Sequence, residues 1–446
     1  MGSLLSGIQV IGGPVPIVIG SIASAAIAAL VVRRRPRGKR LSWAITVAVA
    51  AIVGALIGLV ACWLVSDVAK TLEISLTPSA RGWVALAFAA ISVAVVNIHG
   101  SRLRRKFGAL AAIMCFVLVG AIGVNADFGQ YPTLGSIVDA SSYTAMPTDI
   151  LESQHAAASQ TRGDTVALWQ SWNAPSTMPT HGIVGTVTIP PTISNFAARA
   201  AYLYLPPAAL VATPPPLPVL IMLAGQPGSP QAVFVAGKLA ALLDSIAAQH
   251  HGLAPIVVVP DQLSAANRNP MCIDSPLGNS ATYLSVDVPH WIRENLGVQV
   301  DPSRWAIGGF SQGGTCSIQL AAEHPQLFGS VLDICGELAP SLGSEKETIV
   351  RGFHGDAAAY RAVKPLALLA SRAPYANSVA IFGAGQFDTI FAPFARDLAA
   401  AASTAGMHTS LFVSPGTGHD WSTVRYTLER GLPIVFRQMG LTGPES

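Results

Sequence analysis

The sequence predicts two architectures in one chain: an all-α bundle of four membrane-spanning helices, then an α/β domain with a mainly parallel sheet flanked by helices. Hydrophobic residues make up 51% of the 446 residues and charged residues only 11%, against roughly 25% charged residues in an ordinary soluble domain. The first 126 residues are mostly long apolar runs. Beyond residue 180, short strand-like runs alternate with helical segments, which is the pattern of a parallel sheet covered by helices.

Four apolar stretches occupy the N-terminal part, at about residues 9–32, 43–65, 83–98 and 107–124. A helix needs about 20 mostly apolar residues to cross the hydrocarbon core, so the third stretch is short. Four stretches in succession disfavour a cleaved signal peptide, which has one apolar region, and they disfavour buried core helices. We expect residues 1–126 to form a four-span membrane anchor.

The charged residues around these stretches predict an orientation. Two basic clusters, residues 33–40 and 102–106, join spans one to two and three to four, whereas loop 66–82 has two basic and two acidic residues. Lys and Arg are retained on the cytoplasmic side, so both ends of the anchor and everything after residue 125 are expected outside the cytoplasm. The interiors of the stretches carry no charge, which disfavours a transporter.

Residues 127–180 are polar, without a sustained period, and are expected to form an extracytoplasmic linker or stalk with a short helix near 149–159. The α/β domain is expected over 181–446. It opens with an antiparallel strand pair, residues 182–190 and 199–207.

A continuous apolar run at 219–225 is typical of a strand buried on both faces. A helix is expected over 231–249, and a second one over 281–295. Its expected core contacts are Tyr283, Val286, Val288, Trp291 and Ile292. The remaining expected strands are 254–261, 305–310, 329–336, 378–385 and 409–415, and the remaining expected helices are 313–325, 392–406 and 421–439.

Residues Gly309-Phe310-Ser311-Gln312-Gly313 form a Gly-x-Ser-x-Gly pentamer between a predicted strand and a predicted helix. The pentamer alone is weak evidence in a chain with 41 glycines, but this strand–turn–helix context is the one that exposes a catalytic serine on a strained turn. A serine hydroxyl also needs a base that takes its proton and a group that holds the base. Ser311 is therefore a candidate nucleophile.

His419 follows the last predicted strand and opens the last helix, which suits a general base. Asp388 lies just beyond the preceding strand, where the acid is expected, and the chain order Ser, acid, His matches the same arrangement. The alternatives are a surface or capping role for His419 and an N-cap of the following helix for Asp388. The rival acids are Asp420, Asp333 and Asp356.

The oxyanion that develops on an ester carbonyl needs two backbone N–H donors. One is expected from Gln312, directly after the candidate nucleophile. The other is expected from Gln226, in a loop rich in Gly and Pro after the 219–225 strand. The alternative is that this loop is an ordinary strand-to-helix turn.

Three of the five cysteines, Cys272, Cys316 and Cys335, lie in the expected outer domain, where disulfides persist. We expect a Cys272–Cys316 bridge and a reduced Cys335, with other pairings open. The other two cysteines lie in membrane spans. No cluster has metal-ligand spacing, no cofactor motif is present, and no basic stripe suggests nucleic-acid binding.

Taken together, these segments resemble the esterase-D-like branch of the α/β-hydrolases, which includes carboxylesterases, feruloyl esterases and mycolyltransferases of actinobacterial envelopes. The segments are YLYLPP, LPVLIMLAGQPG, VVVPD, YLSVDVPHWI, GGFSQGGTCS, HPQLFGSVLDICGE and GTGHDW. The resemblance covers roughly residues 181–439. It implies Ser311 as nucleophile, His419 as base, Asp388 as acid, and oxyanion donors at Gln226 and Gln312.

The chain departs from the mycolyltransferases, which usually carry Met at the position of Gln312, use Glu as the acid and lack a multi-span anchor. The leading hypothesis is a membrane-anchored serine esterase that acts outside the cytoplasm on acyl or aminoacyl esters of envelope lipids or related amphiphiles. An acyltransferase of the mycolyl type is the alternative, and a non-catalytic membrane-anchored scaffold is the alternative from another class.

Overall fold

The computed structural model describes residues 5, 7–32, 39–69, 74–99, 101–138, 143–159 and 166–443. The chain divides into two compact units. The first, here called the helical unit, contains Met1–Ser142 and two short segments from late in the chain, Gln386–Ile390 and Gly416–Ser422. The second, the α/β unit, contains Tyr143–Gly385, Phe391–Pro415 and Thr423–Ser446.

The helical unit is built on four long helices, α2 (Pro14–Val31), α3 (Arg40–Trp63), α4 (Pro78–Ile98) and α5 (Leu103–Phe128). A π-helical turn, η2 (Leu64–Val68), extends α3, and the short α6 (Leu134–Ile137) follows α5. Helix α4 packs against α3, α5 and α2, and α2 also packs against α5. All four long helices are long and apolar enough to cross a membrane by length and composition.

The helix ends differ from the expected apolar stretches for local reasons. Helix α4 begins at Pro78 rather than near residue 83, because the Thr77 side chain caps it by accepting a hydrogen bond from the Ala80 N–H, and Pro suits the first helical position. It is therefore 21 residues long, enough for a span. The basic cluster at 102–106 is mostly the first turn of α5 rather than a loop. Residues 33–38 lie outside the described residues.

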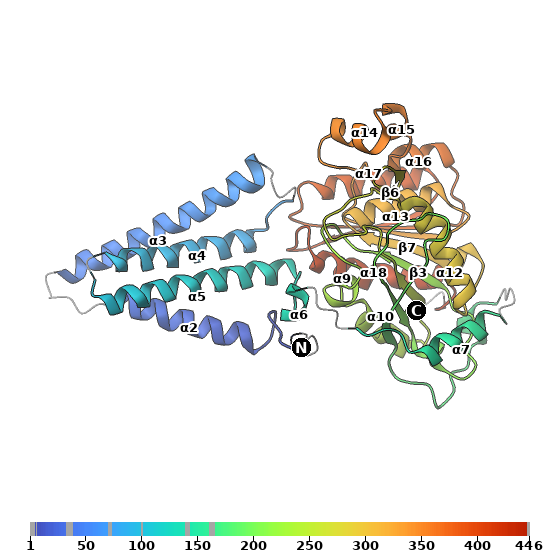
Figure 1. Cartoon of the computed structure of the whole chain (residues 1–446), viewed down its shortest axis with the longest axis horizontal. Helices are drawn as coiled ribbons and strands as arrows, with labels where there is room; N and C mark the ends of the chain where they lie inside the picture. Colours follow the sequence, from blue (N-terminus) through green and yellow to red (C-terminus); the bar gives the residue numbers. More distant parts are fainter. Residues whose placement is uncertain are drawn as a thin grey trace. The chain divides into compact units, whose positions relative to one another are not determined.

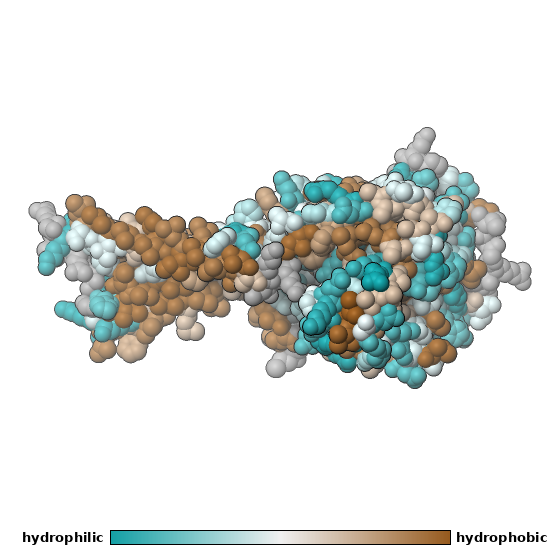
Figure 2. Space-filling view, turned by 90° about the horizontal axis from the view of Figure 1, so that it is seen from above, coloured by the Kyte–Doolittle hydropathy of each residue, from teal (hydrophilic) through white to brown (hydrophobic). Residues whose placement is uncertain are grey.

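Large apolar side chains cover the outside of the helical unit, which is coloured brown along the long helices (Figure 2). The exposed fractions are 70% for Ile17, 60% for Ile52, 68% for Phe107 and 70% for Met114. Such a surface would be unfavourable in water, where large exposed apolar patches mark binding or membrane contact.

The α/β unit contains an eight-stranded sheet in the order β1-β2-β4-β3-β7-β8-β9-β10. Strands β1 and β2 pair antiparallel, as do β2 and β4, and all further neighbours pair parallel. The strands are β1 (Ile183–Val187), β2 (Ala201–Leu205), β3 (Val219–Leu223), β4 (Ile256–Val259), β7 (Trp305–Phe310), β8 (Ser330–Ile334), β9 (Val379–Gly385) and β10 (His408–Ser414). A small hairpin is formed by β5 (Asp274–Ser275) and β6 (Gly278–Asn279).

Helices flank this sheet (Figure 1). Every residue of β2, β3, β4, β7, β8 and β9 is buried, as expected for sheet strands covered on both faces. The helices are α7 (Thr148–Ala158), α8 (Leu168–Ser171), α9 (Ala232–Val235), α10 (Leu239–Gln249), α11 (Ser280–Thr282), α12 (Val288–Asn295), α13 (Gln312–Glu323), α14 (Glu345–Phe353), α15 (Ala357–Ala362), α16 (Pro365–Arg372), α17 (Phe391–Thr404) and α18 (Trp421–Gln438). Short 3₁₀ turns are η3 (Pro207–Leu210) and η5 (Pro302–Arg304), and η4 (Tyr283–Asp287) is π-helical.

Two expected helices are not continuous α-helices. The 231–249 segment breaks into α9 and α10 at Lys238, which has a left-handed backbone (φ 53°) that an α-helix cannot contain. In the 281–295 segment the π-turn η4 changes the helical period. Val286 is therefore 43% exposed and the expectation that it lies in the core is wrong, whereas Tyr283 is fully buried.

The second part of the expected stalk packs onto the α/β unit. Ala145 forms a bridge to Thr186 beside β1, and the buried Gln154 of α7 donates to the Ala209 carbonyl at 2.8 Å. Residues 143–159 and 166–180 therefore belong to the α/β unit. Part of this segment forms backbone hydrogen bonds to the edge strand β1.

Candidate functional site

Ser311 occupies the turn between β7 and α13. Its backbone angles are φ 58° and ψ −120°, a region that costs a residue with a side chain of order 1–3 kcal/mol and persists only where surrounding contacts enforce it. Here the Ser311 N–H donates to the Ile334 carbonyl at 2.8 Å, and the Ser311 carbonyl accepts from Thr315 N–H at 3.0 Å. The turn thus has the strained backbone expected of a nucleophile elbow.

The two glycines of the pentamer are required by close backbone approach. A Cβ on Gly313 would lie 2.5 Å from the carbonyl oxygens of Leu223 and Ala224 at the end of β3, and a Cβ on Gly309 would lie 2.3 Å from the Gly313 carbonyl oxygen. These neighbours are backbone atoms that have no freedom to move aside. The two glycines of the motif are therefore required by the close packing of this turn.

Behind the turn, the Gln312 side chain is 8% exposed and belongs to a buried polar network. Its Nε2 donates to Asn269 Oδ1 at 3.1 Å, and its Oε1 accepts from Gln262 Nε2 at 3.0 Å. Gln262 Nε2 also donates to the Ala224 carbonyl at 2.6 Å. Gln262 and Asn269 could not be predicted from the sequence, because isolated amides at these spacings form no recognisable motif.

A disulfide joins Cys272 to Cys316 with the Cα atoms 5.5 Å apart. This is the pairing expected from the sequence. Gln312 Nε2 lies 3.1 Å from Cys316 Sγ, so the bridge packs directly against the amide that follows Ser311. Cys335 is a buried thiol.

The two backbone N–H groups expected from the sequence as oxyanion donors lie in the turn after β7 and in the loop after β3. Among the residues that the structure describes, neither the Gln226 N–H nor the Gln312 N–H donates a hydrogen bond. Gln312 N–H is the first of α13, where helix geometry supplies no acceptor. The Gln226 side chain donates elsewhere, to the Asn267 carbonyl at 3.3 Å.

His419 and Asp388 form a buried pair. Nδ1 of His419 lies 3.2 Å from Oδ2 of Asp388, and the two residues are 8% and 1% exposed. The loops that carry them are tied together by a hydrogen bond of 2.8 Å from Phe387 N–H to the Thr417 carbonyl. A carboxylate in this position can orient the imidazole and stabilise the imidazolium that forms when the base takes a proton.

The three rival carboxylates have other surroundings. Asp420 accepts from the Gly418 N–H at 2.6 Å, within its own loop. Asp356 caps α15 by accepting from Ala358 and Ala359, and these N–H groups lower its pKa. Asp333 lies inside β8, where burial raises its pKa to about 7.

The three nominated side chains follow parallel strands. Ser311 comes directly after β7, Asp388 three residues after β9 ends at Gly385, and His419 five residues after β10 ends at Ser414. Strands β7, β8, β9 and β10 are consecutive parallel neighbours, so their carboxyl ends lie at one edge of the sheet, where ligand sites of such sheets are found.

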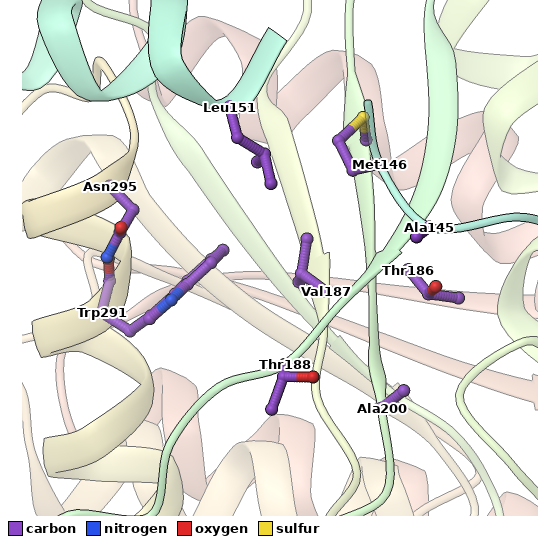
Figure 3. Close-up of a pocket in the computed structure, with 9 residues that line it drawn as sticks. All are labelled: Ala145, Met146, Leu151, Thr186, Val187, Thr188, Ala200, Trp291 and Asn295. Atoms are coloured by element: carbon purple, nitrogen blue, oxygen red, sulfur yellow. The ribbon is translucent and has the colours of Figure 1, made fainter. Parts of the chain in front are cut away.

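A separate pocket of about 350 Å³ lies beside the edge strand β1. Trp291 and Leu151 point toward Val187 from two helices, α12 and α7 (Figure 3). The nine lining residues include no titratable group and none of the nominated residues. This pocket is therefore distinct from the site formed by the residues predicted from the sequence.

The family model described as "Putative esterase" matches residues 197–423, a region that contains Ser311, Asp388 and His419. The chain belongs to this esterase family. A longer stretch, 338 residues, is 33% identical to an uncharacterised protein of Corynebacterium glutamicum, covering 74% of this chain and 76% of that protein. Membership makes the chain a serine ester hydrolase.

Two further similarities are more limited. The MPT51/MPB51 antigen of Mycobacterium tuberculosis is 36% identical over 72 residues, which are 16% of this chain and 23% of the antigen. An S-formylglutathione hydrolase structure from Agrobacterium tumefaciens is 20% identical and covers 59% of this chain and 98% of its own, with a TM-score of 0.48.

Proposed function

We propose that this esterase uses Ser311 as nucleophile, His419 as general base and Asp388 as the acid that orients His419. The observation that carries the proposal is the buried His419–Asp388 pair, at 3.2 Å, on loops that follow β9 and β10. The strained turn at Ser311 after β7 supports it.

In the proposed reaction, Ser311 Oγ attacks the ester carbonyl carbon while His419 takes the hydroxyl proton. The N–H groups of Gln226 and Gln312 donate to the oxyanion of the tetrahedral intermediate. Its collapse breaks the ester C–O bond, His419 returns the proton to the leaving alcohol, and an acyl-enzyme remains on Ser311. Attack by water then releases a carboxylic acid, and attack by another hydroxyl transfers the acyl group. We expect no metal or cofactor in these steps.

We further propose that the helical unit anchors the enzyme in the cell membrane, with the α/β unit outside the cytoplasm. Support comes from four helices of sufficient length and hydropathy, from their exposed large apolar side chains and from the distribution of basic residues. The Cys272–Cys316 disulfide fits an oxidising compartment. An anchored enzyme meets amphiphilic esters at the membrane surface, so acyl or aminoacyl esters of envelope lipids are the proposed substrates.

The proposal is tested by labelling the full chain, purified in detergent, with a fluorophosphonate probe. We expect labelling of the wild type and none of Ser311→Ala. Ser371→Ala is a matched control, since its exposed hydroxyl bonds only to a carbonyl of its own helix region. Asp388→Asn should reduce ester turnover by roughly 10³-fold or more. A folded wild type that fails to label at Ser311 would refute the proposed role of this residue.

Substrate class and acceptor are tested together by comparing envelope lipids of cells that carry wild type or Ser311→Ala. We expect one class of acylated amphiphile to accumulate in the variant. Free acid as the wild-type product indicates hydrolysis, and a new ester on a sugar or lipid hydroxyl indicates transfer. Identical lipid profiles, with active wild type, would exclude envelope lipids as the substrate.

A further inference from the structure

The loops that carry Asp388 and His419 belong to the helical unit. They follow β9 and β10 of the α/β unit in the chain, yet Gln386–Ile390 and Gly416–Ser422 are compact with Met1–Ser142. A catalytic side chain on a loop is placed only as accurately as the groups that hold the loop. The contacts within the helical unit therefore bear on the position of the acid–base pair.

The first contact is made by Ser75, in the segment between α3 and α4. Its hydroxyl lies 2.6 Å from the hydroxyl of Thr389, the residue directly after Asp388. Ser75 is only 8% exposed, so little water competes for this bond. It fixes the loop one residue away from the proposed acid.

The loop Gly416–Ser422, which carries His419, is held on both sides of this residue. A Cβ on Gly418 would lie 2.9 Å from Cγ2 of Thr77 and 3.6 Å from the Ser75 carbonyl oxygen, so the backbone before His419 packs directly on this segment. Beyond His419, Trp421 Nε1 donates to Gln130 Oε1 at 2.9 Å. Trp421 is 3% exposed, and an indole N–H buried to this extent needs such an acceptor.

The 75–77 segment is itself well fixed. Thr77 caps α4 through the Ala80 N–H and donates to Asp127 near the end of α5. The Ser66 hydroxyl accepts from the Leu76 N–H at 3.3 Å. These bonds join the segment to α4, to α5 and to the π-helical turn η2 that extends α3. The segment is therefore held in place by the helices as well as by the loops it contacts.

Gln130 is fixed in the same way by the end of α5. Gly129 ends the helix in a left-handed conformation (φ 64°). The Asn125 side chain then brackets the next turn, accepting from the Tyr131 N–H at 2.9 Å and donating to the Tyr131 carbonyl at 2.8 Å. The Gln130 amide is thereby presented at a defined place.

We infer that Ser75, Thr77 and Gln130 are positioning residues for the Asp388–His419 pair, so that the helical unit is part of the catalytic machinery and not only an anchor. The inference rests on the proposed function of that pair. In this proposal the three residues act through the Asp388–His419 pair and do not contact the substrate. Their loss should therefore lower kcat, which depends on the alignment of the base, more than it changes KM.

Two pairs allow a matched test in the full chain, reconstituted in lipid nanodiscs, with p-nitrophenyl butyrate as substrate. The variants are Ser75→Ala, Thr389→Val and their double, and Gln130→Leu, Trp421→Phe and their double. Each single change removes one buried hydrogen bond and should lower kcat by roughly three- to tenfold, with KM within about twofold. Within each pair, the double variant should be no worse than the more damaging single, because both remove the same bond.

Two controls separate positioning from general damage. Gln130→Glu keeps an oxygen acceptor for Trp421 and should retain most of the wild-type kcat. Thr46→Ala removes an exposed hydroxyl of α3 that bonds only to the Ser42 carbonyl, and it should leave kcat unchanged.

Unchanged kcat in folded Ser75→Ala and Gln130→Leu would overturn the inference. So would additive losses, or losses that follow the melting temperature of each variant, since these indicate a role in stability only. Failure of the proposed function gives a different result: the wild type itself would show no labelling at Ser311 and no turnover.

Discussion

Helix α3 of the helical unit and strand β3 of the α/β unit place large and small side chains in opposite positions. In α3, Ile52 and Leu56 are 60% and 56% exposed, and the buried residues of this helix are Gly54, Gly58 and Cys62. In the α/β unit, every side chain of β3 is 1% exposed or less. Strand β3 thus buries its large apolar groups as a protein in water does, whereas α3 presents Ile52 and Leu56 outward. Elsewhere in the helical unit some large apolar side chains are buried, among them Leu30, Val93 and Phe116.

The interior of the helical unit explains this inversion. A Cβ on Gly54 would lie 2.4 Å from the Phe88 carbonyl oxygen, and one on Gly58 would lie 3.1 Å from Ala85 Cα. The backbones of α3 and α4 are therefore in close contact. Small residues at helix contacts and large ones outside are the pattern of helices packed in lipid, where burial of apolar side chains gives no advantage. The difference between the units is the one expected if, as proposed above, the helical unit lies in lipid and the α/β unit lies in water.

The largest expected difference concerns the disulfide, which only the α/β unit contains among the described residues. Cys272 and Cys316 are 44 residues apart, and a loop of this size predicts a loss of about 4 kcal/mol when the bond is removed. Cys272→Ser with Cys316→Ser should therefore lower the melting temperature of the α/β unit strongly, measured by tryptophan fluorescence. Cys115→Ser in α5 is the control, and an equal effect there would contradict the assignment.

The next prediction concerns Asp333, buried in β8, whose pKa burial raises to about 7 while the Gly336 N–H acts in the opposite direction. Because the folded state binds this proton more tightly than the unfolded chain, stability should fall as pH rises from about 4 to about 7 and then level off. We expect a loss of roughly 2–3 kcal/mol between pH 5 and pH 8. Asp333→Asn should remove most of this dependence in melting curves of the full chain.

Asp356 provides the control for that measurement. It is exposed, and the N–H groups of Ala359 and Ala358 lower its pKa, so its stabilising contribution is lost only on acidification below about pH 4. Asp356→Asn should therefore leave the slope between pH 5 and pH 8 as in the wild type. A wild-type chain without any slope in this range would mean that Asp333 is ionised at little cost.

The smallest expected effect is in the helical unit. Gly54→Val places a side chain against the backbone of α4 and should destabilise the unit by about 1–3 kcal/mol, as overpacking does. Gly20→Val in α2 is the matched control, since nothing lies within 4 Å of a Cβ at that glycine. The melting temperature in detergent distinguishes them. Equal tolerance of the two changes would argue against close packing of α3 on α4.

Much of the architecture could be predicted from the sequence because it depends on local patterns. Strand runs such as 219–225 and the apolar stretches follow from hydrophobic periodicity. The errors occurred where local geometry departs from the regular period. The left-handed Lys238 splits one helix, and the π-turn η4 moves Val286 to the surface.

The proposed site residues could be predicted from the sequence, because the prediction depends on a sequence motif and on the order of the residues in the chain. Ser311, Asp388 and His419 follow strands that the sequence also predicts. The buried amides Gln262 and Asn269 could not be found in this way, because their role depends on contacts 50 and 43 residues away in the chain.

The sequence by itself determined the two classes of architecture and the candidate nucleophile, since hydropathy and glycine spacing are local properties. Only the tertiary structure decided which carboxylate lies against His419: Asp388 pairs with it, whereas the adjacent Asp420 bonds to Gly418. It also decided that the loops of this pair are compact with the apolar helices, through the contact of Ser75 with Thr389, 314 residues away. No local pattern records such a contact, because it forms only when distant parts of the chain meet.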